Sequence, residues 1–232
     1  MKTIGLIGGM SWESTVPYYR SINELVKERL GGLHSACVVL YSVDFEEIEQ
    51  LQDAGKWDEA GEVLAGAARS VEAAGADFLV LCTNTMHKVV GAIEAAVTIP
   101  LLHIADATAA EVRRAGVSTV GLLGTRFTME QDFYRGCLEE QHGIKVLVPE
   151  EQDRERVHRI IYDELCRGII NDTSRDRYRE IIDALVERGA RGVILGCTEI
   201  SLLVSQADSS VPLFDTTSIH ARSAVDFALQ EG

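Results

Sequence analysis

One stretch of the sequence occurs twice, and this repeat limits the folds that the chain can adopt. The first copy is an apolar run, Phe78 to Leu81, that follows a glycine turn and ends at Cys82-Thr83-Asn84-Thr85. The second copy lies 114 positions later, where Val193 to Gly196 are followed by Cys197-Thr198-Glu199. At that offset Cys197 aligns with Thr83, and Gly196 aligns with Cys82. Four consecutive apolar residues are typical of a parallel strand covered on both faces, so the repeat predicts two similar halves.

The start of each half is repeated as well. Residues 3–9 match residues 119–125, and both segments read as a strand that ends in a glycine turn. Further strands are expected at residues 37–43 and 97–104 in the first half, and at 145–149 and 211–216 in the second. Helices are expected at residues 14–30, 44–52, 59–74, 154–167, 175–188 and 218–229.

This order of elements predicts an α/β fold with two pseudo-symmetric, doubly wound lobes and mainly parallel sheets. Lobe 1 is expected to cover residues 1–101, with residues 212–232 packing back onto it, and lobe 2 to cover residues 102–211. Ligands of open α/β sheets bind at the carboxyl ends of the strands. We therefore expect the active site in a cleft between the lobes, lined by polar strand ends from both.

Charge and cysteine usage exclude several classes of partner. A net charge of −14 and a pI near 4.8 argue against binding to nucleic acid or to an anionic membrane surface. The apolar N-terminal segment is too short for a signal peptide, and no apolar run is long enough to span a membrane. Five cysteines without CxxC spacing favour reduced thiols over disulfides or a metal site. We expect a cytoplasmic protein without a bound metal.

The two strand ends suit a reaction that inverts a tetrahedral carbon. Such a reaction needs one acid or base on each face of a carbanion, which a pseudo-symmetric pair can supply. A dinucleotide-binding site is disfavoured because Gly5, Gly8 and Gly9 do not give GxGxxG spacing. A phosphatase loop would need an arginine where Lys88 stands. A cysteine hydrolase would need a histidine from elsewhere, which the sequence leaves open.

Four motifs give the chain a resemblance to a known family. They are Ile7-Gly8-Gly9-Met10-Ser11, Asn84-Thr85-Met86-His87, Leu123-Gly124-Thr125 and Gly196-Cys197-Thr198-Glu199. Over essentially its whole length the sequence resembles the cofactor-independent aspartate/glutamate racemases. The resemblance implies a duplicated α/β fold, a homodimer, and racemisation by two cysteines without pyridoxal phosphate or metal.

The resemblance also implies roles for individual residues. Cys197 matches the C-terminal catalytic cysteine, which serves the L-enantiomer. Positions that contact the carboxylate and ammonium of the substrate match Asn84, Thr85, Thr125 and Thr198, and Met10 lines the same pocket. Where relatives place an arginine that grips a side-chain carboxylate, this chain has Gln52.

One departure from the family pattern changes the expected chemistry. The first motif of the family reads Cys-Asn-Thr, whereas this chain has Thr83 in that register and a cysteine one residue earlier, at Cys82. Side chains alternate along a strand, so we expect Thr83 rather than Cys82 to face the substrate. A hydroxyl is a much weaker acid than a thiol, whose pKa is about 8.5 and can fall to about 3.5 to 7.5 at a helix N-terminus. Cys82, His87 and Glu199 are expected to support the site, although His87 could simply cap or pack.

The expected function is racemisation of a small polar amino acid at Cα. Cys197 would act as base for the L-enantiomer, with Thr83 on the opposite face. L-Aspartate and L-glutamate are the leading substrates, and the neutral Gln52 would admit homoserine and other polar amino acids. The alternatives are a hydantoin racemase or maleate isomerase type of enzyme, and a weakly active amino-acid binding protein.

Overall fold

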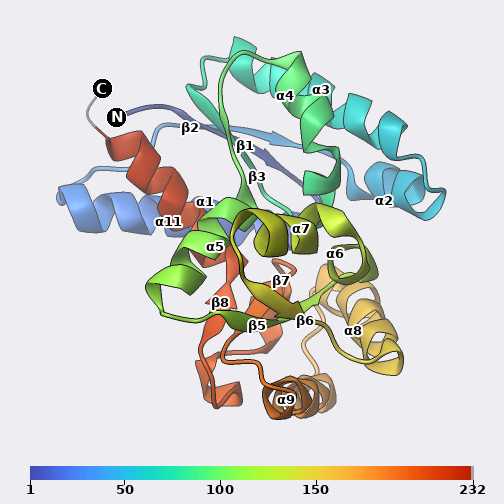
Figure 1. Ribbon diagram of the computed structural model, residues 1–232. Coiled ribbons are helices and arrows are strands. Elements are labelled where there is room, and N and C mark those ends of the chain that lie inside the picture. Colours follow the sequence, from blue (N-terminus) through green and yellow to red (C-terminus); the bar gives the residue numbers. More distant parts are fainter. Residues whose placement is uncertain (231–232) are drawn as a thin grey trace. The chain divides into compact units, whose positions relative to one another are not determined.

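The computed structural model describes residues 1–230 and contains two four-stranded sheets in which neighbouring strands are parallel (Figure 1). The first sheet has the order β2-β1-β3-β4 and the second has β6-β5-β7-β8. The strands are β1 (Ile4–Gly8), β2 (Val38–Ser42), β3 (Phe78–Leu81), β4 (Leu101–Leu102), β5 (Thr119–Gly124), β6 (Lys145–Leu147), β7 (Val193–Gly196) and β8 (Leu213–Asp215). Each strand of the first sheet has a counterpart at the same place in the second. The predicted α/β class with two similar halves is confirmed.

The chain divides into two compact units. Unit 1 is Met1–Ile104 together with the chain from His220 onward, and unit 2 is Ala105–Ile219. Both crossings between the units lie inside helices, α5 (Ile104–Arg114) and α11 (Thr216–Leu229). The boundary expected after residue 101 lies close to the first crossing, whereas residues 212–219, expected to pack with lobe 1, belong to unit 2. Of the range 212–232, the last two residues lie outside the described residues.

In unit 1, helices cover both faces of the sheet (Figure 1). They are α1 (Trp12–Leu30), α2 (Phe45–Asp53), α3 (Trp57–Ala73) and α4 (Val90–Ala96). Alternation along β3 sends its side chains into two cores. Leu79 and Leu81 pack in a cluster with residues of α3, whereas Phe78 and Val80 pack with residues of α1 and α11. An apolar strand that is buried on both faces is what the sequence run predicts.

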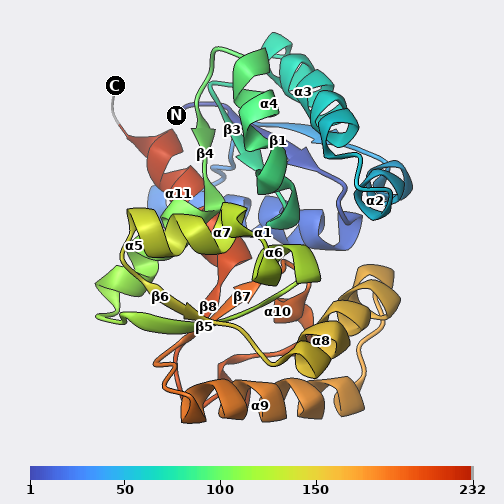
Figure 2. The same ribbon diagram turned by 45° about the vertical axis from the view of Figure 1, so that its right-hand side comes forward.

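Unit 2 repeats this arrangement around its own sheet (Figure 2). Its helices are α6 (Arg126–Glu130), α7 (Asp132–Gly136), α8 (Glu151–Asp163), α9 (Asp172–Glu187) and α10 (Ile200–Leu203), with most of α5. Helices α5 and α7 lie on the opposite face of the sheet from α9 in both views. Val193 and Leu195 of β7 pack in one cluster with residues of α8 and α9.

Some expected elements were wrong in extent. The strand expected at residues 97–104 is only Leu101–Leu102, and the helix expected at 154–167 ends at Asp163, before a separate 3-10 turn at Leu165–Arg167. Helices α5 and α7 and a π-helical turn at Cys137–Gln141 were missed, and no range was expected from the sequence for α4, α6 and α10. Within residues 1–230, no helix is both long enough and apolar enough to cross a membrane.

Candidate active site

The glycine turn after β1 brings the backbone into close contact with its neighbours. A Cβ on Gly9 would lie 2.3 Å from the Val43 carbonyl oxygen, and the residue has a φ of 94° that favours glycine. The Gly9 amide donates a hydrogen bond to Thr15 Oγ1 at 2.8 Å, which ties the turn to α1. Met10 follows, 4% exposed, and packs with Met86 and residues of α3.

The chain bends at Cys82, just past the end of β3, and the Thr83 amide donates a hydrogen bond to the Leu81 carbonyl at 2.8 Å. Cys82 is fully buried in the core formed with α1 and α11, where burial raises the pKa of its thiol far above the ordinary value. Its sulfur lies 3.8 Å from the Val80 carbonyl oxygen in the same core. Thr83 is buried as well, 6% exposed. Cys82 is therefore a packed apolar group with no ready route to a thiolate.

Thr83 and Asn84 precede a short 3-10 helix, Thr85–Val89, in which Thr85 is the first residue. All three side chains are buried. The Asn84 carbonyl accepts a hydrogen bond from the His87 amide at 3.2 Å, and the Thr83 carbonyl lies 2.7 Å from His87 Nδ1. These two hydrogen bonds tie His87 to the loop that carries Thr83.

Gln52 lies near the end of α2, which starts after the N-cap Asp44, whose side chain accepts from the Glu46 amide. Gln52 is only 4% exposed, and its Nε2 lies 2.9 Å from the Met86 sulfur. Met10, Gln52 and Met86 thus come together beside the loop that carries Thr83, all within unit 1.

In unit 2, Thr125 and Cys197 follow paired residues on neighbouring strands. Gly124 of β5 pairs with Gly196 of β7, and a Cβ on Gly124 would lie 2.8 Å from the Gly196 carbonyl oxygen. These glycines allow the two strand ends to approach closely. Thr125 is buried and caps α6, with its hydroxyl accepting from the Thr128 amide at 3.3 Å.

Cys197 makes a direct contact with an acidic group. Its thiol donates to Glu199 Oε2 at 2.9 Å, and the Thr198 hydroxyl donates to the same oxygen at 2.7 Å. Cys197 is 8% exposed and Glu199 is 2% exposed. Burial, and then the Glu199 carboxylate, hold the pKa of the Cys197 thiol well above its ordinary value. Cys197 is therefore a protonated thiol, not the low-pKa thiolate that a helix N-terminus could favour, and α10 behind it has only four residues.

A second thiol reaches the same carboxylate, and the sequence analysis missed it. Cys166, in the 3-10 turn after α8, lies 3.7 Å from Glu199 Oε1, so the two carboxylate oxygens face two different cysteines. No sequence pattern links Cys166 to Cys197, because the two residues lie on separate elements and share no motif.

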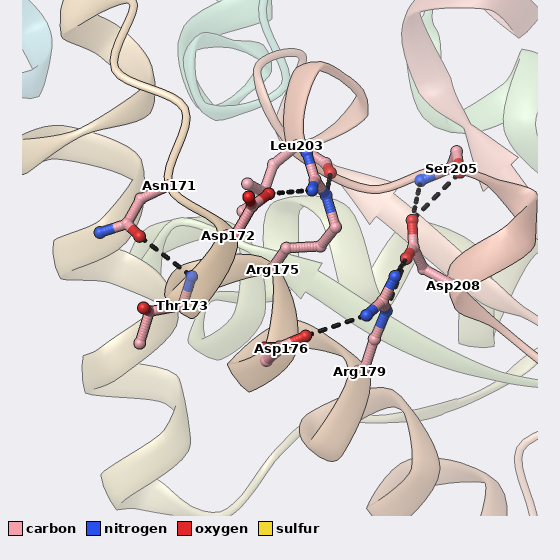
Figure 3. A network of polar contacts seen from close by, with 9 residues as sticks. All are labelled: Asn171, Asp172, Thr173, Arg175, Asp176, Arg179, Leu203, Ser205 and Asp208. Atoms are coloured by element: carbon pink, nitrogen blue, oxygen red, sulfur yellow. Dashed lines mark hydrogen bonds and ion pairs between the residues drawn. The ribbon is translucent and has the colours of Figure 1, made fainter.

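Helix α9 braces the segment that follows Cys197 (Figure 3). Arg175 Nε donates to the Leu203 carbonyl at 2.8 Å, at the end of α10, and Arg179 Nε donates to Asp208 Oδ1 at 2.6 Å. Asp208 in turn accepts from the Ser205 amide at 2.8 Å. The Ser205 amide and Arg179 hold the pKa of Asp208 below its ordinary value. The segment that follows Cys197 is therefore held by the two arginines of α9.

Comparisons with known proteins assign a family to this arrangement. The family model of the Asp/Glu/Hydantoin racemases matches residues 7–224. The chain belongs to this family. The match covers the second sheet, the first sheet from the end of β1 onward, and every site residue expected from the sequence, so the resemblance seen in the four motifs is confirmed at the level of the family.

Individual relatives agree with this assignment. A candidate Asp/Glu racemase from Yersinia pestis is 63% identical, with a TM-score of 0.92 and coverage of 99% of this chain and 100% of that one. An aspartate racemase homologue from Pyrococcus horikoshii OT3 is 37% identical, with a TM-score of 0.85 and the same coverage. The broad specificity amino-acid racemase RacX of Bacillus subtilis (strain 168) is 24% identical over 234 residues, 96% of each chain. The prediction of an enzyme of the amino-acid racemase class is confirmed.

Proposed function

We propose that this protein racemises a small polar amino acid at Cα without a cofactor, using Cys197 as the base for the L-enantiomer. The observation that carries the proposal is the buried Cys197 thiol, which lies 2.9 Å from Glu199 Oε2 at the carboxyl end of β7. Thr83 occupies the equivalent place after β3, and we propose that it acts on the opposite face of Cα.

Glu199 gives the thiol a route to its basic form. A thiolate is the species that can abstract the α-proton, so Cys197 must first lose its own proton. Glu199 Oε2 already accepts the hydrogen bond from that thiol and is placed to receive the proton. The thiolate then takes the α-proton from the L-amino acid and leaves a carbanion. Thr198 donates to the same Glu199 oxygen and keeps the carboxylate in this orientation.

Thr83 supplies the return step in this proposal. Its hydroxyl gives a proton to the carbanion from the opposite face, which yields the D-enantiomer. Solvent then restores the proton to Thr83 and takes up the proton held by Glu199, which resets the site. In the reverse direction a hydroxyl would have to act as a base, which it does poorly because it is a far weaker acid than a thiol. We therefore expect the enzyme to act faster on L- than on D-substrates.

We propose L-aspartate and L-glutamate as the leading substrates, with other polar amino acids such as homoserine accepted as well. The buried Gln52 supplies a neutral amide beside the Thr83 loop, so it offers no charge-assisted grip on a side-chain carboxylate. The similarity to the broad specificity amino-acid racemase RacX supports this range of substrates.

A hydantoin substrate is the second candidate. The family description names hydantoin racemases beside those for aspartate and glutamate, and a ring substrate would need proton removal at the same kind of carbon.

Proton exchange at Cα is the test of the proposal. L- and D-enantiomers of aspartate, glutamate and homoserine, and a 5-substituted hydantoin, are incubated with the protein in deuterated water and followed by NMR. Loss of the α-proton signal of an L-amino acid is expected, and deprotonation is detected even when net racemisation is slow. Exchange confined to the hydantoin would favour the second candidate. If the amino acids bind but none of the compounds exchanges its α-proton, the protein would be an amino-acid binding protein and not a racemase.

We also propose that no metal or pyridoxal phosphate takes part. Exchange should continue at an unchanged rate after dialysis against EDTA and in the absence of pyridoxal phosphate. Loss of exchange on dialysis that a divalent metal restores would contradict this.

The family resemblance further leads us to propose a cytoplasmic homodimer. Sedimentation velocity should give a species of twice the chain mass of 25.4 kDa. A species at the single-chain mass at micromolar concentration would contradict the dimer.

A further inference from the structure

Thr83 lies beyond the point where the sheet holds its strand. The pairing of β3 with β1 ends at Leu81, and its pairing with β4 ends at Val80. A side chain that must meet a substrate carbon from a fixed direction therefore needs another support for its backbone. His87, four residues later, supplies one, because its Nδ1 lies 2.7 Å from the Thr83 carbonyl oxygen.

The same imidazole is held from its other side. The backbone amide of Ile104, just after β4, donates to His87 Nε2 at 3.3 Å. A carbonyl can only accept and an amide can only donate, so Nδ1 carries the proton and Nε2 is the acceptor. His87 is 2% exposed, and burial holds its pKa well below the ordinary value, which suits this single neutral tautomer. One ring thus joins the carboxyl ends of β3 and β4.

A second histidine fixes the neighbouring strand end in the same manner. His220 of α11 lies with Nε2 at 2.9 Å from the Leu102 carbonyl oxygen, and its Nδ1 lies 3.0 Å from the hydroxyl of Tyr18 in α1. His220 is fully buried, and its ring centroid is 6.0 Å from that of His87. His220 therefore contacts β4 and α1, whereas His87 contacts Thr83 itself. A variant of His220 can thus serve as a control for a variant of His87.

We propose that His87 is a positioning residue of the racemisation, which holds the Thr83 carbonyl and so fixes the direction of the Thr83 hydroxyl. The inference rests on the proposed function of Thr83. It assigns His87 to one half of the reaction only. The return of a proton on the Thr83 face depends on His87, whereas proton removal by Cys197 does not.

The test compares two products of one reaction. L-Aspartate in deuterated water gives deuterated L-aspartate when Cys197 removes the α-proton and a solvent-derived deuteron returns on the same face, and deuterated D-aspartate when the deuteron comes from the Thr83 face. In His87→Ala, formation of the D-product should fall by about 10-fold to 100-fold relative to L-exchange, as expected for a displaced reacting group. A purely structural role would lower both products together.

Two conservative variants and one control sharpen the result. His87→Asn keeps an amide donor near the Nδ1 position and should restore much of the D-product, whereas His87→Gln places its amide near Nε2 and should not. His220→Gln alters the neighbouring strand end without touching Thr83, so it should leave the ratio of the two products unchanged even if it lowers the melting temperature. An unchanged ratio in all His87 variants, with exchange intact in the parent protein, overturns this inference alone. Absence of exchange in the parent overturns the proposed function, and the role of His87 with it.

Discussion

At the scale of single residues, the end of β3 decides which side chain is available for chemistry. Cys82 is the more reactive type of residue, but it packs in the core with α1 and α11. Thr83 is one residue further, after the bend at Cys82. The internal repeat aligns Thr83 with Cys197, which packs with Val193 and Leu195 in the cluster with residues of α8 and α9.

Replacing Thr83 by cysteine tests this position. Thr83→Cys puts a thiol where the hydroxyl is a poor base, and a well-matched general acid or base contributes about 10² to 10⁴ in rate. Turnover of D-aspartate should rise more than turnover of L-aspartate, measured as α-proton exchange from each enantiomer. Thr83→Ser is the matched control and should behave like the parent. A Thr83→Cys variant no faster than Thr83→Ser would show that this residue does not face Cα.

Gln52 is the residue expected to determine how many kinds of amino acid the enzyme accepts. In Gln52→Arg a guanidinium could grip the side-chain carboxylate of aspartate, and a hydrogen bond to a charged group contributes about 1.5 to 3 kcal/mol. The ratio of kcat/KM for aspartate over homoserine should therefore rise by about 10-fold or more. Gln52→Met, which keeps the size of the side chain but not its polar amide, controls for packing beside Met86. If the ratio is the same in both variants and the parent, Gln52 does not contact the substrate side chain.

At the scale of elements, the positions of the central strands were predictable and the connections were not. Phe78 to Leu81 and Val193 to Gly196 are apolar, buried runs whose length already indicates a covered parallel strand. Helix α5 was missed because its sequence follows the Ile99-Pro100 segment, which reads as an extended strand that continues to Ile104. The short helices between Arg126 and Gln141 are interrupted at Gln131 and end in a π-helical turn, a geometry that no simple period in the sequence marks.

The site was predictable where it follows the repeat and not where it depends on distant segments. Thr83, Cys197 and their polar neighbours are found by aligning the two halves. Cys166 and the Arg175 contact depend on how α8 and α9 pack, and side chains from separate helices meet only once the fold is formed. The bonds of His220 likewise require α11 to return to the first sheet.

The brace from α9 gives a prediction at this scale. Arg175→Met removes the charged donor from the Leu203 carbonyl at the end of α10. Because this arginine is partly exposed, 29%, we expect a loss of about 1 kcal/mol in unfolding free energy, below the usual range for such bonds. Arg177→Met is the control. Arg177 lies on the same helix and forms an ion pair with the exposed Glu180. Urea denaturation of the two variants should differ, and equal midpoints would show that the brace does not contribute.

At the scale of the whole molecule, two similar sheets are joined in one chain with equivalent strand orders. The repeat gives two equivalent strand ends, of which one carries a hydroxyl at Thr83 and the other a thiol at Cys197 beside the Glu199 carboxylate. The first unit also contains a buried pair of neutral histidines, His87 and His220, that has no counterpart in the sequence repeat.

These histidines predict how global stability depends on pH. Burial lowers the pKa of His220 to about 4 from the ordinary value of 6.5, and lowers that of His87 as well. Between about pH 6.5 and pH 4 the unfolded chain therefore binds protons that the folded chain does not bind. The stability that the two neutral histidines contribute is fully present above about pH 6.5 and decreases as the pH falls toward about 4. Unfolding free energies measured by urea denaturation from pH 7.5 to 5 should decline, and His220→Gln should make the slope shallower by up to one proton. An identical slope in the variant and the parent would contradict this reading of the pair.

The central claim is that Cys197, and not Cys82, removes the α-proton of the L-substrate. The most direct measurement is the rate of α-proton exchange of L-aspartate in deuterated water, compared between Cys197→Ser and Cys82→Ala. We predict that Cys197→Ser abolishes exchange, with a loss of at least about 10² in rate, while Cys82→Ala keeps it within a few-fold of the parent. A folded Cys82→Ala protein as inactive as Cys197→Ser, or a Cys197→Ser protein that still exchanges at the parent rate, would contradict the account.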